Sequence, residues 1–130
     1  MTFAYRLAAL ALAAGLAAPA IASADGKSLY MDNCSACHQV SGKGVKGAFP
    51  ALAGAPLVQG PPKVLITTVL NGRAGMPAFK DDITDADLAS ILTYARTTWG
   101  NKGSAIKPAD VAAARVAAKA APKPRGLQAH

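Results

Sequence analysis

The stretch "DNCSACHQV", residues 32–40, contains both cysteines of the 130-residue chain. Cys34 and Cys37 are separated by two residues, and His38 follows directly. Three kinds of site use thiols and an imidazole placed so close together: a disulfide or redox pair, part of a zinc site, and a covalent attachment point for haem c. The residues around this motif provide the evidence that distinguishes these three sites.

The zinc and disulfide alternatives each lack something. A structural zinc site needs four ligands, but Cys34, Cys37 and His38 provide three, and the sequence has no second pair of cysteine or histidine ligands. A thioredoxin-type pair belongs in a βαβ unit, whereas the pattern here is helical. A plain disulfide would close too small a loop to stabilise the fold much.

Covalent haem attachment uses every member of the motif. The thiols of Cys34 and Cys37 add to the two vinyl groups of the porphyrin, and their spacing places both sulfurs on one side of a short helical turn. His38 then directs a ring nitrogen towards the iron. In an exported chain, the C-x-x-C-H pattern therefore predicts one covalent haem c, with His38 as an axial ligand.

Residues 1–24 have the organisation of a secretory signal peptide. A start containing Arg6 precedes an apolar run of Ala and Leu, and Ala22-Ser23-Ala24 forms an A-x-A cleavage site. A retained membrane anchor is the alternative, but the run is short for a span and is broken by glycine and proline. We expect a periplasmic protein that begins at Asp25 and has no integral membrane span.

The net charge of +7 is concentrated towards the C-terminus. Residues 25–101 contain seven Lys or Arg and six Asp, whereas residues 102–130 contain six Lys or Arg and one Asp. We therefore divide the mature chain into a domain, 25–101, and a basic tail, 102–130, rich in Ala and Pro. The domain lacks a basic aromatic surface, so nucleic-acid binding is not expected.

Hydrophobic periodicity predicts a helix over residues 25–38 and a second from the N-cap Thr84 to Gly100. Residues 41–62 are rich in Gly and Pro and predict a loop that wraps something. Residues 63–72 favour a strand by propensity, but a helix starting at the preceding prolines is equally allowed. In the tail we expect an Ala-rich helix from about Pro108, loosely held or disordered, whose removal leaves the absorption spectrum unchanged.

Met76 is the candidate for the second axial ligand of the iron. It lies between Gly75 and Pro77, 38 residues after His38, in a loop that can reach the opposite face of the porphyrin. The other methionine of the mature chain, Met31, lies on the same predicted helix as His38. The competing ligand is His130, which would have to be ordered from the end of the tail.

With these residues in place, the chain resembles small class I c-type cytochromes over residues 25–101. Besides the C-x-x-C-H motif and Gly75-Met76-Pro77, the stretch 49–54, "FPALAG", is similar to the family's Pro-x-Leu-x-Gly loop. Gly26 and Tyr30 stand at the positions where the family crosses its first and last helices, against Ile91 and Tyr94. The resemblance is strongest to monohaem cytochromes that act as subunits or partners of periplasmic dehydrogenases and oxidases.

The resemblance implies an all-α class I cytochrome c fold, with about three to five short helices around one haem, and it makes residues 63–72 helical. It also implies that the Pro50 carbonyl accepts the Nδ1–H of His38 and that Leu52 packs against the haem. Arg73 is a candidate partner for a haem propionate.

The expected function is one-electron transfer between a dehydrogenase and an oxidase or other acceptor, without enzymatic activity, by a monomer or loosely associated subunit. Such partners would meet an apolar patch around the haem edge, with Lys43, Lys46 and Lys80 at its rim. Two alternatives stay open: a haem c subunit of a multi-subunit dehydrogenase or oxidase, and a haem enzyme or sensor with a labile sixth ligand. The apolar centre of the patch is expected from Ala48, Phe49, Pro77, Ala78 and Phe79.

Overall fold

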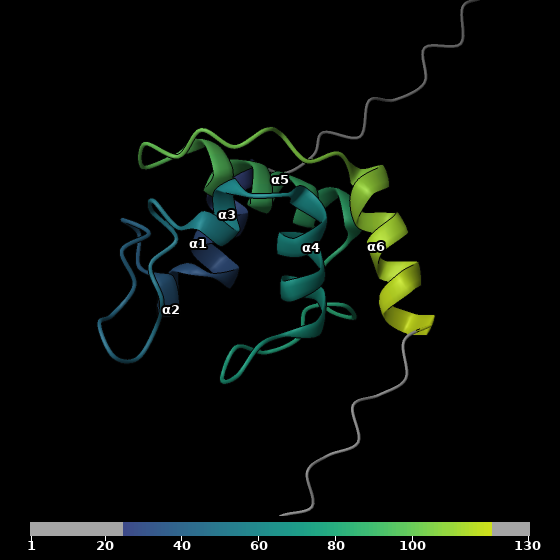
Figure 1. The fold of residues 1–130 in the computed structure, drawn as a ribbon, viewed down its shortest axis with the longest axis horizontal. Helices are drawn as coiled ribbons and strands as arrows, with labels where there is room; N and C mark the ends of the chain where they lie inside the picture. Colours follow the sequence, from purple (N-terminus) through teal and green to yellow (C-terminus); the bar gives the residue numbers. More distant parts are fainter. Residues whose placement is uncertain (1–24, 121–130) are drawn as a thin grey trace, which may run out of the picture.

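The computed structural model describes residues 25–120, and within them every regular element is a helix (Figure 1). This confirms the all-α class. There are six helices in the described residues, more than the three to five expected, because the first predicted helix is divided in two and the predicted loop 41–62 contains one short helix, Pro56–Gln59. The helices are α1 (Gly26–Asn33), α2 (Ser35–His38), α3 (Pro56–Gln59), α4 (Pro62–Asn71), α5 (Asp85–Thr97) and α6 (Pro108–Ala120).

The first predicted helix begins and breaks for local reasons. Asp25 caps α1, because its carboxylate accepts a hydrogen bond from the Ser28 backbone N–H at 3.4 Å. At Cys34 the backbone leaves the helical region, and α2 starts one residue later as a single turn. Gln39 ends α2 with a φ of 66°, so the haem-attachment motif sits on its own short turn.

The ambiguous segment 63–72 is helical. Pro62 occupies the first turn of α4, where its missing N–H leaves no helical hydrogen bond unmade, and Gly72 ends the helix with a φ of 73°. Burial, and not propensity, decides the outcome here. The buried residues of α4 form one apolar stripe, consisting of Leu65, Ile66, Val69 and Leu70.

Helix α5 begins as the sequence predicts and ends at Thr97, three residues before the predicted end at Gly100. The Thr84 side chain accepts a hydrogen bond from the backbone N–H of Asp87 at 3.1 Å, which confirms the N-cap. The helix does not reach Trp99, because Trp99 and Gly100 take left-handed φ values of 55° and 82° after the C-cap Thr98. The indole N–H of Trp99 donates to the Val40 carbonyl at 3.1 Å and links the C-terminus of α5 to the loop after α2.

Helices α1 and α5 cross at Gly26, as the family resemblance implies. A Cβ atom built on Gly26 would lie 2.3 Å from the Ser90 carbonyl oxygen, so only glycine allows this approach. One turn further along, the ring of Tyr30 lies 5.4 Å from that of Tyr94 and 5.2 Å from that of Trp99. Tyr30 is fully buried, and its hydroxyl donates to the Gln39 carbonyl at 2.8 Å.

Helix α6 corrects the expectation of a loosely held tail. It starts at Pro108 as predicted, but it packs against α4 and α5 (Figure 1), and Val111 is completely buried. Few apolar side chains are needed because alanine allows close packing, and Ala114 is 5 % exposed. The boundary at residue 101 stays a prediction, while the signal peptide and His130 lie outside the described residues. No helix within residues 25–120 is long and apolar enough to cross a membrane.

Candidate haem site

The C-x-x-C-H motif forms one helical turn. The backbone N–H of His38 donates to the Cys34 carbonyl at 3.0 Å, and that of Cys37 donates to the same oxygen at 3.3 Å. Both thiols are free and half-buried. The turn therefore holds two unpaired thiols and an imidazole in adjacent positions, as thioether attachment requires.

The environment of Cys34 disfavours this residue as the attacking thiol of a redox pair. Burial, and secondarily the neighbouring Cys37 thiol, raise the pKa of Cys34 to about 11. A cysteine that acts in thiol–disulfide exchange needs a lowered pKa, because the thiolate is the attacking species. Cys34 is protonated at neutral pH and thus a poor attacking group.

A zinc site also finds no support. Within residues 25–120, no group of three or more His, Cys, Asp or Glu side chains could hold a metal ion. The three polar members of the motif are too close together in sequence to surround one tetrahedral ion. Of the chemistries considered for the motif, haem attachment is the one that the donor set fits.

His38 is oriented by a backbone carbonyl. Its Nδ1 atom lies 2.9 Å from the Pro50 oxygen, and the ring is 9 % exposed. A carbonyl oxygen can only accept, so Nδ1 carries a proton, and in the neutral imidazole Nε2 then has the lone pair. The expected contact between His38 and Pro50 is therefore present, and Nε2 is the nitrogen that can bind iron.

The loop that supplies this carbonyl is held from two sides. On one side, the Gly44 N–H donates to the His38 carbonyl at 3.0 Å. On the other, the buried Asn101 side chain accepts from the Gly54 N–H at 2.8 Å and donates to the Leu52 carbonyl at 3.1 Å. Leu52 is partly buried against the main hydrophobic cluster. No sequence pattern links Asn101 to this loop, which lies nearly 50 residues earlier.

Met76 lies in a tight turn after α4. The Met76 N–H donates to the Arg73 carbonyl at 2.9 Å, and the Arg73 N–H donates back at 3.2 Å. Further on, the N–H groups of Phe79 and Lys80 donate to the Val69 and Leu70 carbonyls, each at 3.2 Å. The Met76 side chain is partly buried against the hydrophobic cluster, whereas Arg73 is exposed. Both residues thus share one turn, as a ligand and a neighbouring propionate partner would.

The predicted docking patch is partly visible as exposed apolar surface. Phe49 is 42 % exposed. The loop that carries it, residues 43–51, lines a cavity of about 410 Å³. Lys43 and Lys46 are exposed in this loop, while Lys80 is half-buried after the Met76 turn. The lysines therefore occupy two separate loops, and the docking role stays a prediction.

Comparison with known proteins agrees with this donor set. A sequence profile of the family described as cytochrome c oxidase, cbb3-type, subunit III matches residues 22–94, more than half of the chain. The chain belongs to the class I c-type cytochromes. The family binds covalent haem c, and its members include electron carriers and haem c subunits of dehydrogenases and oxidases.

Three relatives illustrate this range. The cytochrome is 34 % identical over 97 residues to a cytochrome c-552 of Thermus thermophilus, an alignment that covers 63 % of this chain and 65 % of the relative. It is 38 % identical over 96 residues to the cbb3-type cytochrome c oxidase subunit CcoP of an Azospirillum species, covering 68 % and 32 %. With the cytochrome c subunit of the quinone alcohol dehydrogenase of Gluconobacter oxydans it shares 34 % over 88 residues, covering 58 % and 18 %. The cytochrome thus spans about a fifth to a third of the two complex subunits.

Proposed function

We propose that this cytochrome is a periplasmic one-electron carrier whose haem is attached to Cys34 and Cys37 and ligated by His38 and Met76. The observation that best supports the proposal is the hydrogen bond of 2.9 Å between His38 Nδ1 and the Pro50 carbonyl. It leaves Nε2 as the free donor atom of a buried, oriented ring, which is what an axial ligand needs.

Different residues would attach the haem, ligate its iron and exclude water from the site. Covalent haem supplies a one-electron iron couple, and a thioether ligand in an apolar pocket favours the reduced state. Met76 and Leu52 both lie against the hydrophobic cluster, which gives the Met76 side chain apolar neighbours. With two protein ligands no coordination position is open to a substrate, which is why we propose electron transfer without catalysis.

A second candidate function is that of a haem c subunit in a dehydrogenase or oxidase complex. The names of the Gluconobacter and Azospirillum relatives identify them as subunits of such complexes. In either role the redox partners would be a dehydrogenase donor and an oxidase or other acceptor. Co-purification of the cytochrome with a partner from periplasmic extract would favour the subunit role over the free carrier.

The ligand set is tested on the purified holoprotein. Its mass should exceed that of the polypeptide by one haem, and the ferric form should show the weak red charge-transfer band of a sulfur–iron bond. Met76→Ala should abolish this band, and Met31→Ala, which alters the other methionine of residues 25–120, should keep it. If the wild type lacks the band and its reduced form binds carbon monoxide readily, the electron-carrier proposal is wrong and a labile sixth position is indicated.

A further inference from the structure

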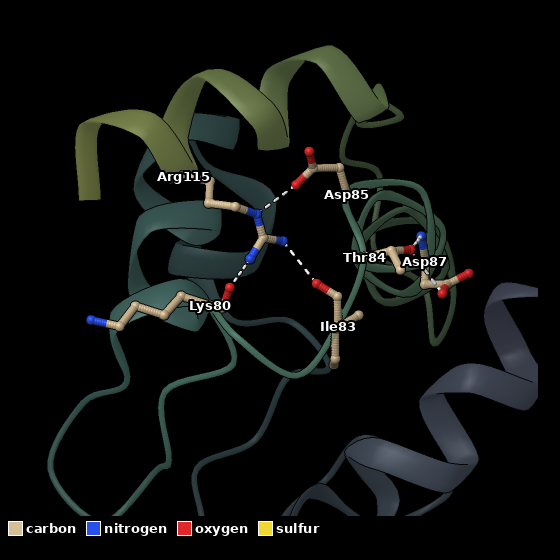
Figure 2. A network of polar contacts seen from close by, with 6 residues as sticks. All are labelled: Lys80, Ile83, Thr84, Asp85, Asp87 and Arg115. Carbon is tan, nitrogen blue, oxygen red and sulfur yellow. Dashed lines mark hydrogen bonds and ion pairs between the residues drawn. The ribbon is translucent and has the colours of Figure 1, made fainter. Parts of the chain in front are cut away.

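Arg115 joins α6 to the segment that follows the Met76 turn (Figure 2). Its Nε donates to the Asp85 carboxylate at 2.7 Å, its Nη2 donates to the Ile83 carbonyl at 2.8 Å, and its Nη1 donates to the Lys80 carbonyl. The side chain of Lys80 points away from the guanidinium, so only its backbone takes part. One guanidinium thus binds three groups within six consecutive residues.

The guanidinium is placed by the buried face of α6. Val111 and Ala114 precede Arg115 by four and one positions and are 0 % and 5 % exposed. The Arg115 side chain is itself only 15 % exposed, and that of its partner Asp85 is 35 % exposed. Charge-assisted hydrogen bonds at this depth are stronger than those between neutral or fully exposed groups. Helix α6 is therefore fastened to this segment by polar contacts as well as by packing.

Residues 72–84, between α4 and α5, form the Met76 segment. Two hydrogen bonds that hold this segment to neighbouring helices meet at Lys80. Its N–H donates to the Leu70 carbonyl of α4 at 3.2 Å, and its carbonyl accepts from Arg115 of α6. Met76 lies four residues before this point, between Lys80 and the end of α4. Without Arg115, the Met76 segment would keep its backbone hydrogen bonds to α4. It would lose the hydrogen bonds that its carbonyl groups accept from α6.

We propose that Arg115 is a positioning residue for Met76, holding the C-terminal end of its segment so that the thioether stays on the iron. The inference rests on the proposed function, because it takes Met76 as the axial ligand. A neutral thioether competes poorly with nitrogen ligands for ferric iron unless the chain keeps it in place. The proposal predicts that removing the tail weakens the sulfur–iron band, in contrast to the expectation from the sequence that the spectrum stays unchanged.

The experiment measures how readily imidazole displaces Met76 from the ferric holoprotein, followed by loss of the sulfur–iron band. Imidazole binds the iron only in molecules whose Met76 has left it, a state we call the open segment. The apparent imidazole affinity therefore reports the fraction of molecules in which the segment is open. We expect Arg115→Ala to tighten the apparent imidazole affinity about tenfold, since the variant loses three charge-assisted contacts. Arg115→Lys should give a smaller gain, because an ammonium keeps the charge but cannot reach three separated acceptors.

Two control variants separate positioning from charge and from stability. Lys119→Ala removes a positive charge from the exposed last turn of the same helix and should leave imidazole affinity within about twofold of the wild type. Ile106→Ala removes buried apolar atoms between α5 and α6 without touching the guanidinium, so it should lower stability but not open the segment.

The outcomes distinguish this inference from the ligand assignment itself. If the wild type shows the sulfur–iron band but Arg115→Ala binds imidazole as weakly as the wild type does, Arg115 does not position Met76. The inference is equally overturned if Ile106→Ala opens the segment as much as Arg115→Ala does. A wild type without the band would instead refute the proposed ligand set, before any variant of Arg115 is considered.

Discussion

Gly44 lies against the carbonyl group of Pro50, so closely that a Cβ atom on Gly44 would be 2.6 Å from the Pro50 oxygen. The same oxygen accepts the hydrogen bond of 2.9 Å from His38 Nδ1. A glycine, a backbone carbonyl and an imidazole therefore form one connected unit. The position of the His38 ring depends on the lack of a side chain six residues away.

Gly44→Ala is accordingly predicted to disturb the iron ligand through the Pro50 carbonyl. A weakened Nδ1 hydrogen bond makes the imidazole a poorer donor, which stabilises ferric iron less, so the reduction potential should rise. The positive φ of 63° at Gly44 should also lower the free energy of unfolding by about 1–3 kcal/mol. A redox titration followed by absorbance measures the potential.

Gly47→Ala is the matched control for this prediction. Gly47 lies in the same loop with a φ of 82°, and a Cβ atom there would meet nothing within 4 Å. It should share the backbone strain of Gly44→Ala but not the change in potential. Equal potentials for the two variants would refute the link from Gly44 to His38.

The haem motif and its partners could be predicted because they are local or belong to a family pattern. Cys34, Cys37 and His38 are adjacent in sequence, and Pro50 was implied by the resemblance. The helical state of residues 63–72 was not decided by propensity, since Ile66 and Val69 are β-branched and yet lie buried on one face of the helix together with Leu65 and Leu70. Single polar residues that bind distant backbone, such as Asn101 and Arg115, leave no periodic signal that a sequence could reveal.

The crossing of α1 and α5 gives a second prediction. Gly26→Ala would place a Cβ atom 2.3 Å from the Ser90 carbonyl oxygen, so the helices must separate. Overpacking of this kind should lower the free energy of unfolding by about 1–3 kcal/mol, measured by guanidinium chloride denaturation. At Gly75 a Cβ atom would meet nothing within 4 Å, and Gly75→Ala should change the stability by less than about 1 kcal/mol. Equal losses in both variants would contradict the close approach.

The buried Tyr30 hydroxyl predicts how stability depends on alkaline pH. Burial raises the pKa of Tyr30 above its ordinary value. The unfolded tyrosine loses its proton near pH 10 while the folded one keeps it, so stability is lost as pH rises from there. The slope contributed by this one group is about 1.4 kcal/mol per pH unit.

Tyr30→Phe tests this contribution. At pH 7 the variant should be less stable by about 1 kcal/mol, because it loses the hydrogen bond to the Gln39 carbonyl. Above pH 10 the difference should shrink and then reverse, because phenylalanine has no proton to lose. Denaturation curves of both proteins between pH 7 and pH 11, followed by circular dichroism, measure it. Parallel pH profiles would show that Tyr30 does not control alkaline stability.

Arg96 gives the last prediction, because its guanidinium is 2 % exposed and binds only neutral groups. It donates to the Val58 and Gly60 carbonyls at 2.6 Å and 2.9 Å and to the carbonyl of Ser104 at 2.6 Å. Burial lowers the pKa of Arg96, because the charged guanidinium loses favourable solvation in the protein interior.

Arg96→Met keeps most of the stem but leaves the carbonyls of Val58, Gly60 and Ser104 without their donor. Loss of these bonds outweighs the relief of desolvation, so we expect the free energy of unfolding to fall by about 2–4 kcal/mol. Lys63→Met, at an exposed position of α4, should change it by less than about 0.5 kcal/mol. The haem spectrum should be the same in both variants, because none of these contacts involves the His38 turn or the Met76 segment. An Arg96→Met protein as stable as the wild type would mean that water replaces the guanidinium without loss.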